Sequence, residues 1–241
     1  MKKWQKGSLV LIPAFILVGL GIYGHRIYER NLYDSLHEKM IYRPVDAEES
    51  AELSVDFSIL QSTNQDIQAW IDIPGTNISY PVLQSSEEER EDYYLRHNLD
   101  RSYGYPGVIY MQKYNSSEYD DPVTILYGHN MRDGSMFAGL HKYKNGKFFE
   151  EHQDIEVYTP NGTRHYRVFA ALQYDDRHIL EAYDGFQAEG GVEEFVEECA
   201  GLADNVDYSV RVDAESKLLV LSTCEKQSDK RYLVVAVLEA E

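Results

Sequence analysis

The run LLVLSTC at residues 218–224, the charged loop EKQSDK at 225–230 and the run RYLVVAVL at 231–238 decide the fold of this chain. Two apolar runs on either side of a short polar loop predict an antiparallel pair of strands. Cys224 then ends the first strand and faces Arg231 at the start of the second. A guanidinium beside a thiol favours the thiolate, the nucleophilic form. A free cysteine is often only a small core residue, so this run alone leaves both interpretations open.

A histidine in a second strand-like run favours the catalytic interpretation. The run VTILY at residues 123–127 ends in the glycine-containing turn GHNM at 128–131. His129 therefore lies at a sheet edge, where loops carry functional residues. Cysteine and histidine that are distant in sequence can meet when both lie at strand ends, so we predict a site of Cys224, His129 and Arg231. Papain-like enzymes have the cysteine first and fit this order poorly.

The remaining sequence is mainly β. Apolar or alternating runs bounded by turn residues predict strands at 71–73, 78–83, 107–111, 123–129, 155–159, 164–172, 217–223 and 232–238. Helical periodicity indicates helices at 31–40, 57–70 and 192–202. Many short strands with few long helices are typical of a closed or nearly closed β-barrel with peripheral helices.

Several motifs follow one another in a fixed order between residue 57 and the C-terminus. They are NQD at 64–66, AWI at 69–71, IPGT at 73–76, YPV at 80–82, YYLRH at 93–97, YGHNM at 127–131, DGSMF at 133–137 with Leu140, and LSTC at 221–224 with Arg231. In this order they resemble the catalytic domain of class B sortases, cysteine transpeptidases of Gram-positive bacteria. The resemblance implies the closed eight-stranded sortase barrel.

The resemblance also implies a thioacyl mechanism. Cys224 would attack a peptide carbonyl in the C-terminal sorting signal of a surface protein, His129 would act as general acid and base, and Arg231 would bind the carbonyl or oxyanion. Substrate contacts are expected from three residues near the thiol: Ser222, Thr223 and Leu95. The acceptor would be an amine of a peptidoglycan precursor or a pilin lysine, and the sequence does not choose between them.

Two other classes of function fit the same residues. A cysteine endopeptidase or hydrolase would use the same three side chains with water as the acceptor, and product analysis with and without an amine separates it from a transpeptidase. A non-catalytic surface-binding module would hold Cys224 in its core. The presence of cysteine, histidine and arginine together favours the transpeptidase.

The N-terminal stretch predicts a membrane anchor. Residues 7–24 carry no charge and follow three lysines, a length at the short end of the membrane-spanning range. No small-residue cleavage site follows, which favours an uncleaved signal anchor over a signal peptide. We expect a cytoplasmic stub and transmembrane helix at 1–26, an extracytoplasmic helix and linker at 27–56, and the catalytic domain at 57–241. The resemblance implies a single-pass protein of the cell membrane with an extracellular catalytic domain.

Composition and spacing argue against several other partners. The 41 acidic and 23 basic residues give a net charge of −18, which disfavours nucleic-acid binding. No glycine-rich phosphate loop follows a strand, and histidines such as His141 lack metal-ligand spacing, so we expect no cofactor or metal. Cys199 lies on the apolar face of the helix at 192–202 and is expected to be an unpaired core residue.

Overall fold

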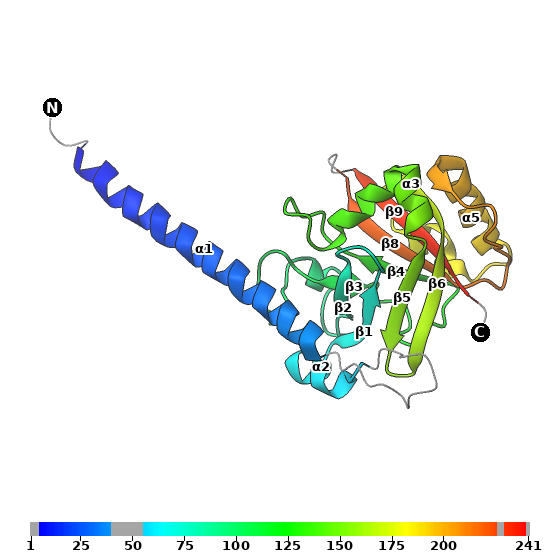
Figure 1. Cartoon of the computed structure of the whole chain (residues 1–241), viewed down its shortest axis with the longest axis horizontal. Coiled ribbons are helices and arrows are strands. Elements are labelled where there is room, and N and C mark those ends of the chain that lie inside the picture. The colour runs from blue at the N-terminus through cyan, green and yellow to red at the C-terminus, as the bar shows by residue number, and fades with distance from the viewer. Residues whose placement is uncertain (1–4, 40–54, 226–228, 240–241) are drawn as a thin grey trace. The chain divides into compact units, whose positions relative to one another are not determined.

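The computed structural model describes residues 5–39, 55–225 and 229–239, with side chains in the first helix described for 16–38 (Figure 1). The chain divides into two compact units, Met1–Ser54 and Val55–Glu241. Residues 40–54 of the helix and linker predicted at 27–56, and residues 226–228 of the loop after Cys224, lie outside the described residues.

The first unit corrects the prediction of a membrane anchor. A single helix, α1 (Gln5–Lys39), joins the apolar stretch to the polar helix predicted at 31–40. Spanning a bilayer takes about 20 apolar residues, and α1 continues beyond Gly24 into a charged second half. In the part of the chain that the structure describes, which omits the side chains of 7–15, no helix has the length and apolar character to cross a membrane. The transmembrane helix predicted at 7–24 and the single-pass membrane location are therefore wrong.

The second unit is a closed β-barrel. Hydrogen bonding gives the strand order β5-β1-β2-β3-β4-β8-β9-β6, and pairing of β5 with β6 closes the ring of eight among the described residues. The eight bounds are β1 (Ile67–Asp72), β2 (Ser79–Leu83), β3 (Ile109–Met111), β4 (Val123–Tyr127), β5 (Asp154–Thr159), β6 (Gly162–Asp175), β8 (Leu218–Cys224) and β9 (Lys230–Leu238). The barrel predicted from sequence is therefore confirmed, and each predicted strand overlaps an observed one.

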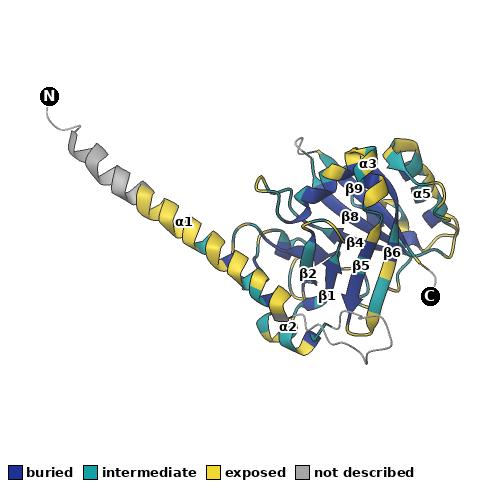
Figure 2. Ribbon diagram, in the orientation of Figure 1, coloured by how far each residue is buried: buried dark blue, intermediate teal, exposed yellow. Residues whose placement is uncertain are grey.

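Short helices and one further strand surround the barrel. Strand β7 (Ala203–Val206) pairs with β6 outside the closed ring. The helices are α2 (Phe57–Thr63), α3 (Gly146–Glu151), α4 (Ile179–Ala182) and α5 (Gly191–Leu202), with 3₁₀ turns η1 (Tyr93–Leu95), η2 (Phe137–Lys144) and η3 (Asp184–Phe186). Buried residues follow the strands and the inner face of α5 (Figure 2). Cys199 is on that face, fully buried and unpaired, as predicted.

The helix predicted at 57–70 is wrong in its second half. Helix α2 ends at Thr63, and Ile67–Asp72 form β1 instead. Asn64 marks the break, because its side chain accepts from the Asp66 N–H at 3.0 Å and donates to the Leu99 carbonyl at 2.9 Å. Strand β1 pairs with both β2 and β5, and these ladders outweigh the helical spacing of its apolar residues.

Packing at the end of β4 leaves no room for a larger residue. The N–H of Gly128, which follows β4, donates to the Ser222 carbonyl at 3.1 Å. A Cβ atom at this position would lie 2.5 Å from Ile109 Cδ1 and 2.7 Å from Phe137 Cγ. Gly128 therefore lets the turn that carries His129 approach the barrel closely.

We predict that Gly128→Ala lowers the free energy of unfolding by about 1–3 kcal/mol, because the added methyl group overpacks the site. Urea denaturation measures the change. Gly201→Ala is the matched control, since a Cβ there would meet nothing within 4 Å. That substitution lies in α5 and should leave stability unchanged or slightly raised. Equal stability of Gly128→Ala and wild type would contradict the close packing.

Candidate active site

The ends of β8 and β9 bring a thiol and a guanidinium together. The two strands are antiparallel, and their register pairs Cys224 with Arg231. Residues directly opposite each other in such a pair project from the same face of the sheet. Both are partly exposed, whereas β8 is buried from Leu218 to Thr223. The strand therefore delivers its last side chain to the surface beside a permanent cation.

Strand β4 places His129 at the same end of the barrel. It runs parallel to β8, with Tyr127 opposite Ser222, so the turn after β4 leaves the sheet next to Cys224. The backbone of this turn is fixed, because the Phe137 N–H donates to the His129 carbonyl at 3.0 Å. The three chemically distinctive residues thus come from the ends of three neighbouring strands.

The His129 ring is oriented by a backbone carbonyl. Its Nε2 lies 2.6 Å from the Leu95 carbonyl oxygen. A carbonyl only accepts hydrogen bonds, so Nε2 carries a proton and Nδ1 holds the lone pair of the neutral ring. Burial lowers the pKa of His129, the bond to Leu95 raises it, and the nearby Arg96 charge lowers it, with a net decrease from 6.5.

The loop that supplies the Leu95 carbonyl is tightly built. The Gly107 N–H donates to Asn98 Oδ1 at 2.9 Å, and Asn98 is fully buried. Gly107 has φ +68°, and a Cβ there would lie 3.0 Å from the Tyr94 carbonyl oxygen and 3.4 Å from His129 Cδ2. Glycine is required at this turn by both its backbone angle and the close approach of the histidine.

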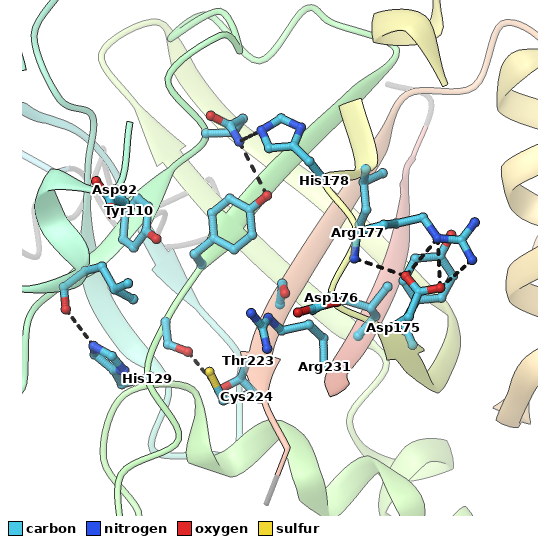
Figure 3. A pocket seen from close by; sticks show the side chains of 18 of the residues that line it. Asp92, Tyr110, His129, Asp175, Asp176, Arg177, His178, Thr223, Cys224 and Arg231 are labelled. Atoms are coloured by element: carbon cyan, nitrogen blue, oxygen red, sulfur yellow. Dashed lines mark hydrogen bonds and ion pairs between the residues drawn. The ribbon is translucent and has the colours of Figure 1, made fainter. Parts of the chain in front are cut away.

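Cys224, His129 and Arg231 line one pocket of about 230 Å³ (Figure 3). Leu95 and Thr223 also line it, together with Ser222. Further walls come from two regions. One runs from the end of β6 to the start of α4 and contributes Tyr174, Asp175, Asp176, Arg177, His178 and Ile179; the other comprises residues on β3 and on either side of it, namely Glu91, Asp92, Tyr110 and Gln112. The pocket therefore joins a thiol, an imidazole and a guanidinium in one space.

Comparison with known proteins identifies the family. The sortase domain model matches residues 71–239. The chain belongs to the sortase family. It is 30% identical to Sortase B of Listeria monocytogenes over 92% of this chain and 89% of that protein. It is 28% identical to Sortase B of Staphylococcus aureus over 96% and 97% of the two chains. The solved structure of a Staphylococcus aureus sortase B–substrate complex superposes with a TM-score of 0.75 at 29% identity, covering 89% of this chain and 97% of that one. These relatives place the chain in class B.

The residues predicted to contact substrate in this sortase differ in how far they are exposed in the pocket. Leu95 is partly exposed on the pocket wall, and its carbonyl is engaged with His129. Ser222 and Thr223 line the pocket but are 3% and 2% exposed. The Thr223 hydroxyl donates to the Gly128 carbonyl at 2.7 Å. Thr223 thus joins β8 to the turn after β4, and its role toward substrate stays a prediction.

Sequence reasoning missed the wall between β6 and α4. His178 caps α4 by accepting from the Glu181 N–H at 3.2 Å, and its Nε2 lies 2.8 Å from Gln112 Nε2. This contact crosses from one wall of the pocket to the other. No motif named from the sequence pointed to this segment. No group of three possible metal ligands occurs among the residues that the structure describes.

We predict that the lowered pKa of His129 makes folding stability depend on pH just below 6.5. In that window the unfolded chain binds the proton and the folded chain does not, so the free energy of unfolding rises as pH increases. Urea denaturation from about pH 5 to 7.5 measures this, with His129→Gln as the reference that removes the titrating group. The stability of wild type minus that of the variant should increase toward pH 6.5. A difference independent of pH would contradict the prediction.

Proposed function

We propose that this chain is a cysteine transpeptidase that cleaves the sorting signal of a surface protein and joins the new carboxyl end to an amine. One observation carries the proposal. The register of β8 with β9 pairs Cys224 with Arg231, and the parallel register of β8 with β4 brings His129 to the same pocket. A nucleophile, a proton-transfer group and a cation in one cavity fit acyl transfer through a thioester.

In the first half-reaction the Cys224 thiolate attacks the carbonyl carbon of the scissile peptide bond. Arg231 donates hydrogen bonds to the oxygen as it becomes negative. The carbon–nitrogen bond then breaks, and His129 gives a proton to the departing amine. The products are a thioester on Cys224 and the C-terminal fragment of the substrate.

In the second half-reaction an amine attacks the thioester carbon. His129, now neutral, removes a proton from that amine, and the thiolate leaves as the new amide forms. Because Nε2 of His129 is held by the Leu95 carbonyl, Nδ1 is the nitrogen that exchanges the proton. The same side chains serve both halves, and no cofactor is needed for the balance of atoms and charge.

Relatives support the substrate class. A solved structure shows Staphylococcus aureus sortase B in complex with substrate, and this chain shares the fold of that protein over 89% of its own length. We therefore assign a surface protein with a C-terminal sorting signal as the acyl donor. The acceptor is an amine of a peptidoglycan precursor or of a pilin lysine, and Leu95, Ser222 and Thr223 line the pocket that receives the donor.

The alternatives predict other observations. A binding module with Cys224 in its core does not fit a thiol that is partly exposed on a pocket wall. A hydrolase would release the free acid whether or not an amine is present. Mass spectrometry of products from a panel of sorting-signal peptides, with and without a glycine or lysine amine, separates hydrolysis from transpeptidation.

We predict that Cys224→Ala lowers peptide cleavage by at least about a thousandfold, because the covalent nucleophile is lost. Cys199→Ala is the control, since that cysteine is fully buried in the core. It should keep the wild-type rate and lose a little stability. A charged methanethiosulfonate should label Cys224 and not Cys199. Retention of more than about a tenth of the rate in Cys224→Ala would refute the assignment.

We predict that Arg231→Lys is nearly as damaging as Arg231→Ala, with kcat/KM reduced on the order of 100-fold in both. Lysine keeps the charge but loses the planar set of donors that can hold a carbonyl or oxyanion. Steady-state kinetics of both variants measure the effect. If the lysine variant kept near-full activity, charge beside the thiol would be sufficient and the oxyanion role would be wrong.

A further inference from the structure

Asn130, the residue after His129, contacts the backbone of the proposed nucleophile. Its Nδ2 donates to the carbonyl oxygen of Cys224 at 3.0 Å, across a separation of 94 residues. This bond adds to the strand pairing between β4 and β8, which stops at Tyr127 and Ser222. It therefore connects the turn that carries the acid–base group directly to the residue that carries the thiol.

His141 contacts the same amide. Its Nε2 lies 2.9 Å from Asn130 Nδ2 and 3.1 Å from the Cys224 carbonyl oxygen, and its Nδ1 lies 3.6 Å from Glu225 Oε1. A carboxylate only accepts, which favours the proton on Nδ1 and leaves Nε2 as an acceptor for an N–H of Asn130. The contacts run from Glu225 through His141 and Asn130 to Cys224.

The His141 ring is itself fixed by its surroundings. It lies in η2, with 22% of its side chain exposed, and its centroid is 5.2 Å from that of Tyr232. Lys144 forms an ion pair with Glu225 and lies 4.8 Å above the Tyr232 ring. His141, whose spacing in the sequence fits no metal site, thus has contacts at both ring nitrogens and on one face of its ring.

We infer that Asn130 is a positioning residue for the proposed transpeptidation, and the inference rests on that proposed function. By tying the His129 turn to the Cys224 carbonyl, Asn130 sets the separation of the two reacting side chains, and His141 orients its amide. Neither Asn130 nor His141 needs to touch the substrate. A misplacement of about 1 Å between reacting groups can cost about 100-fold in rate. Loss of this tie should therefore lower kcat and spare KM.

The first experiment measures kcat and KM for Asn130→Ala and for the isosteric Asn130→Asp. We expect kcat to fall between about 10- and 100-fold while KM stays within about twofold, because only the alignment of reacting groups changes. Asn130→Asp should be at least as slow, since a carboxylate would face the Cys224 carbonyl. Asn161→Ala, in an exposed turn, is the control and should match wild type. A wild-type kcat in Asn130→Ala would overturn the inference.

The second experiment compares His141→Phe with His141→Gln. Phenylalanine keeps a ring against Tyr232 but offers no acceptor, whereas the glutamine amide oxygen can accept from Asn130. We expect His141→Phe to lower kcat and His141→Gln to restore most of it. Residues that act through one contact are not additive, so the double variant Asn130→Ala, His141→Phe should be no slower than Asn130→Ala alone. If His141 had only a structural role, both His141 variants would lose thermal stability and His141→Gln would not restore kcat. If the losses in kcat of the two single variants multiplied in the double variant, the coupling of Asn130 and His141 would be overturned.

Wild type and Cys224→Ala show whether a negative result contradicts the proposed function or only the positioning role of Asn130. If wild type fails to cleave, or Cys224→Ala cleaves at a similar rate, the proposed function is wrong. If those two behave as expected and the Asn130 variants are folded and fully active, only the positioning inference is wrong. Labelling of Cys224 by a methanethiosulfonate while Cys199 stays unlabelled reports a folded protein in each variant. If Asn130→Ala does not fold, the rescue of His141→Phe by His141→Gln decides the question, and absence of rescue overturns the inference.

Discussion

The site depends on the register of β8 between its two neighbours. This strand pairs in parallel with β4 as far as Ser222 and antiparallel with β9 as far as Cys224. Side chains alternate across a strand, so a slip of one residue would turn Cys224 away from Arg231 and move the buried Leu218–Thr223 out of place. The core of the barrel and the geometry of the pocket are thus fixed by the same hydrogen bonds.

Backbone carbonyls then orient the side chains that this register brings together. The Leu95 carbonyl accepts a hydrogen bond from His129 Nε2, and the Gly128 carbonyl accepts one from the Thr223 hydroxyl. The Cys224 carbonyl accepts one from the Asn130 amide. A buried carbonyl favours a donor, because leaving it without one costs free energy. Such contacts give His129 one tautomer and hold the strand that carries Cys224, so these polar side chains are oriented without a bound ligand.

The sequence predicted those parts whose signal is local. Apolar runs located β4, β8 and β9, and the ends of these runs located His129, Cys224 and Arg231. Other parts had no such signal. Strand β7 is short and polar, and its only strand partner among the described residues is β6. Strand β1 carries apolar residues at a spacing that also fits a helix. The apolar stretch at 7–24 did carry a strong local signal, and there the membrane prediction is wrong, because no helix among the described residues has the length and apolar character to cross a membrane.

Contacts between backbone and distant side chains explain why Asn130 and His141 were not recognised from sequence. Any residue type has a carbonyl, so neither Leu95 nor Cys224 reveals in its identity that it accepts a hydrogen bond. Only the parallel register of β4 with β8 makes positions 94 residues apart adjacent. The pocket walls around His178 are instead built from a segment outside the barrel ladders. Substrate preference can therefore change through that wall, while the strand ends that hold the reactive groups stay in register.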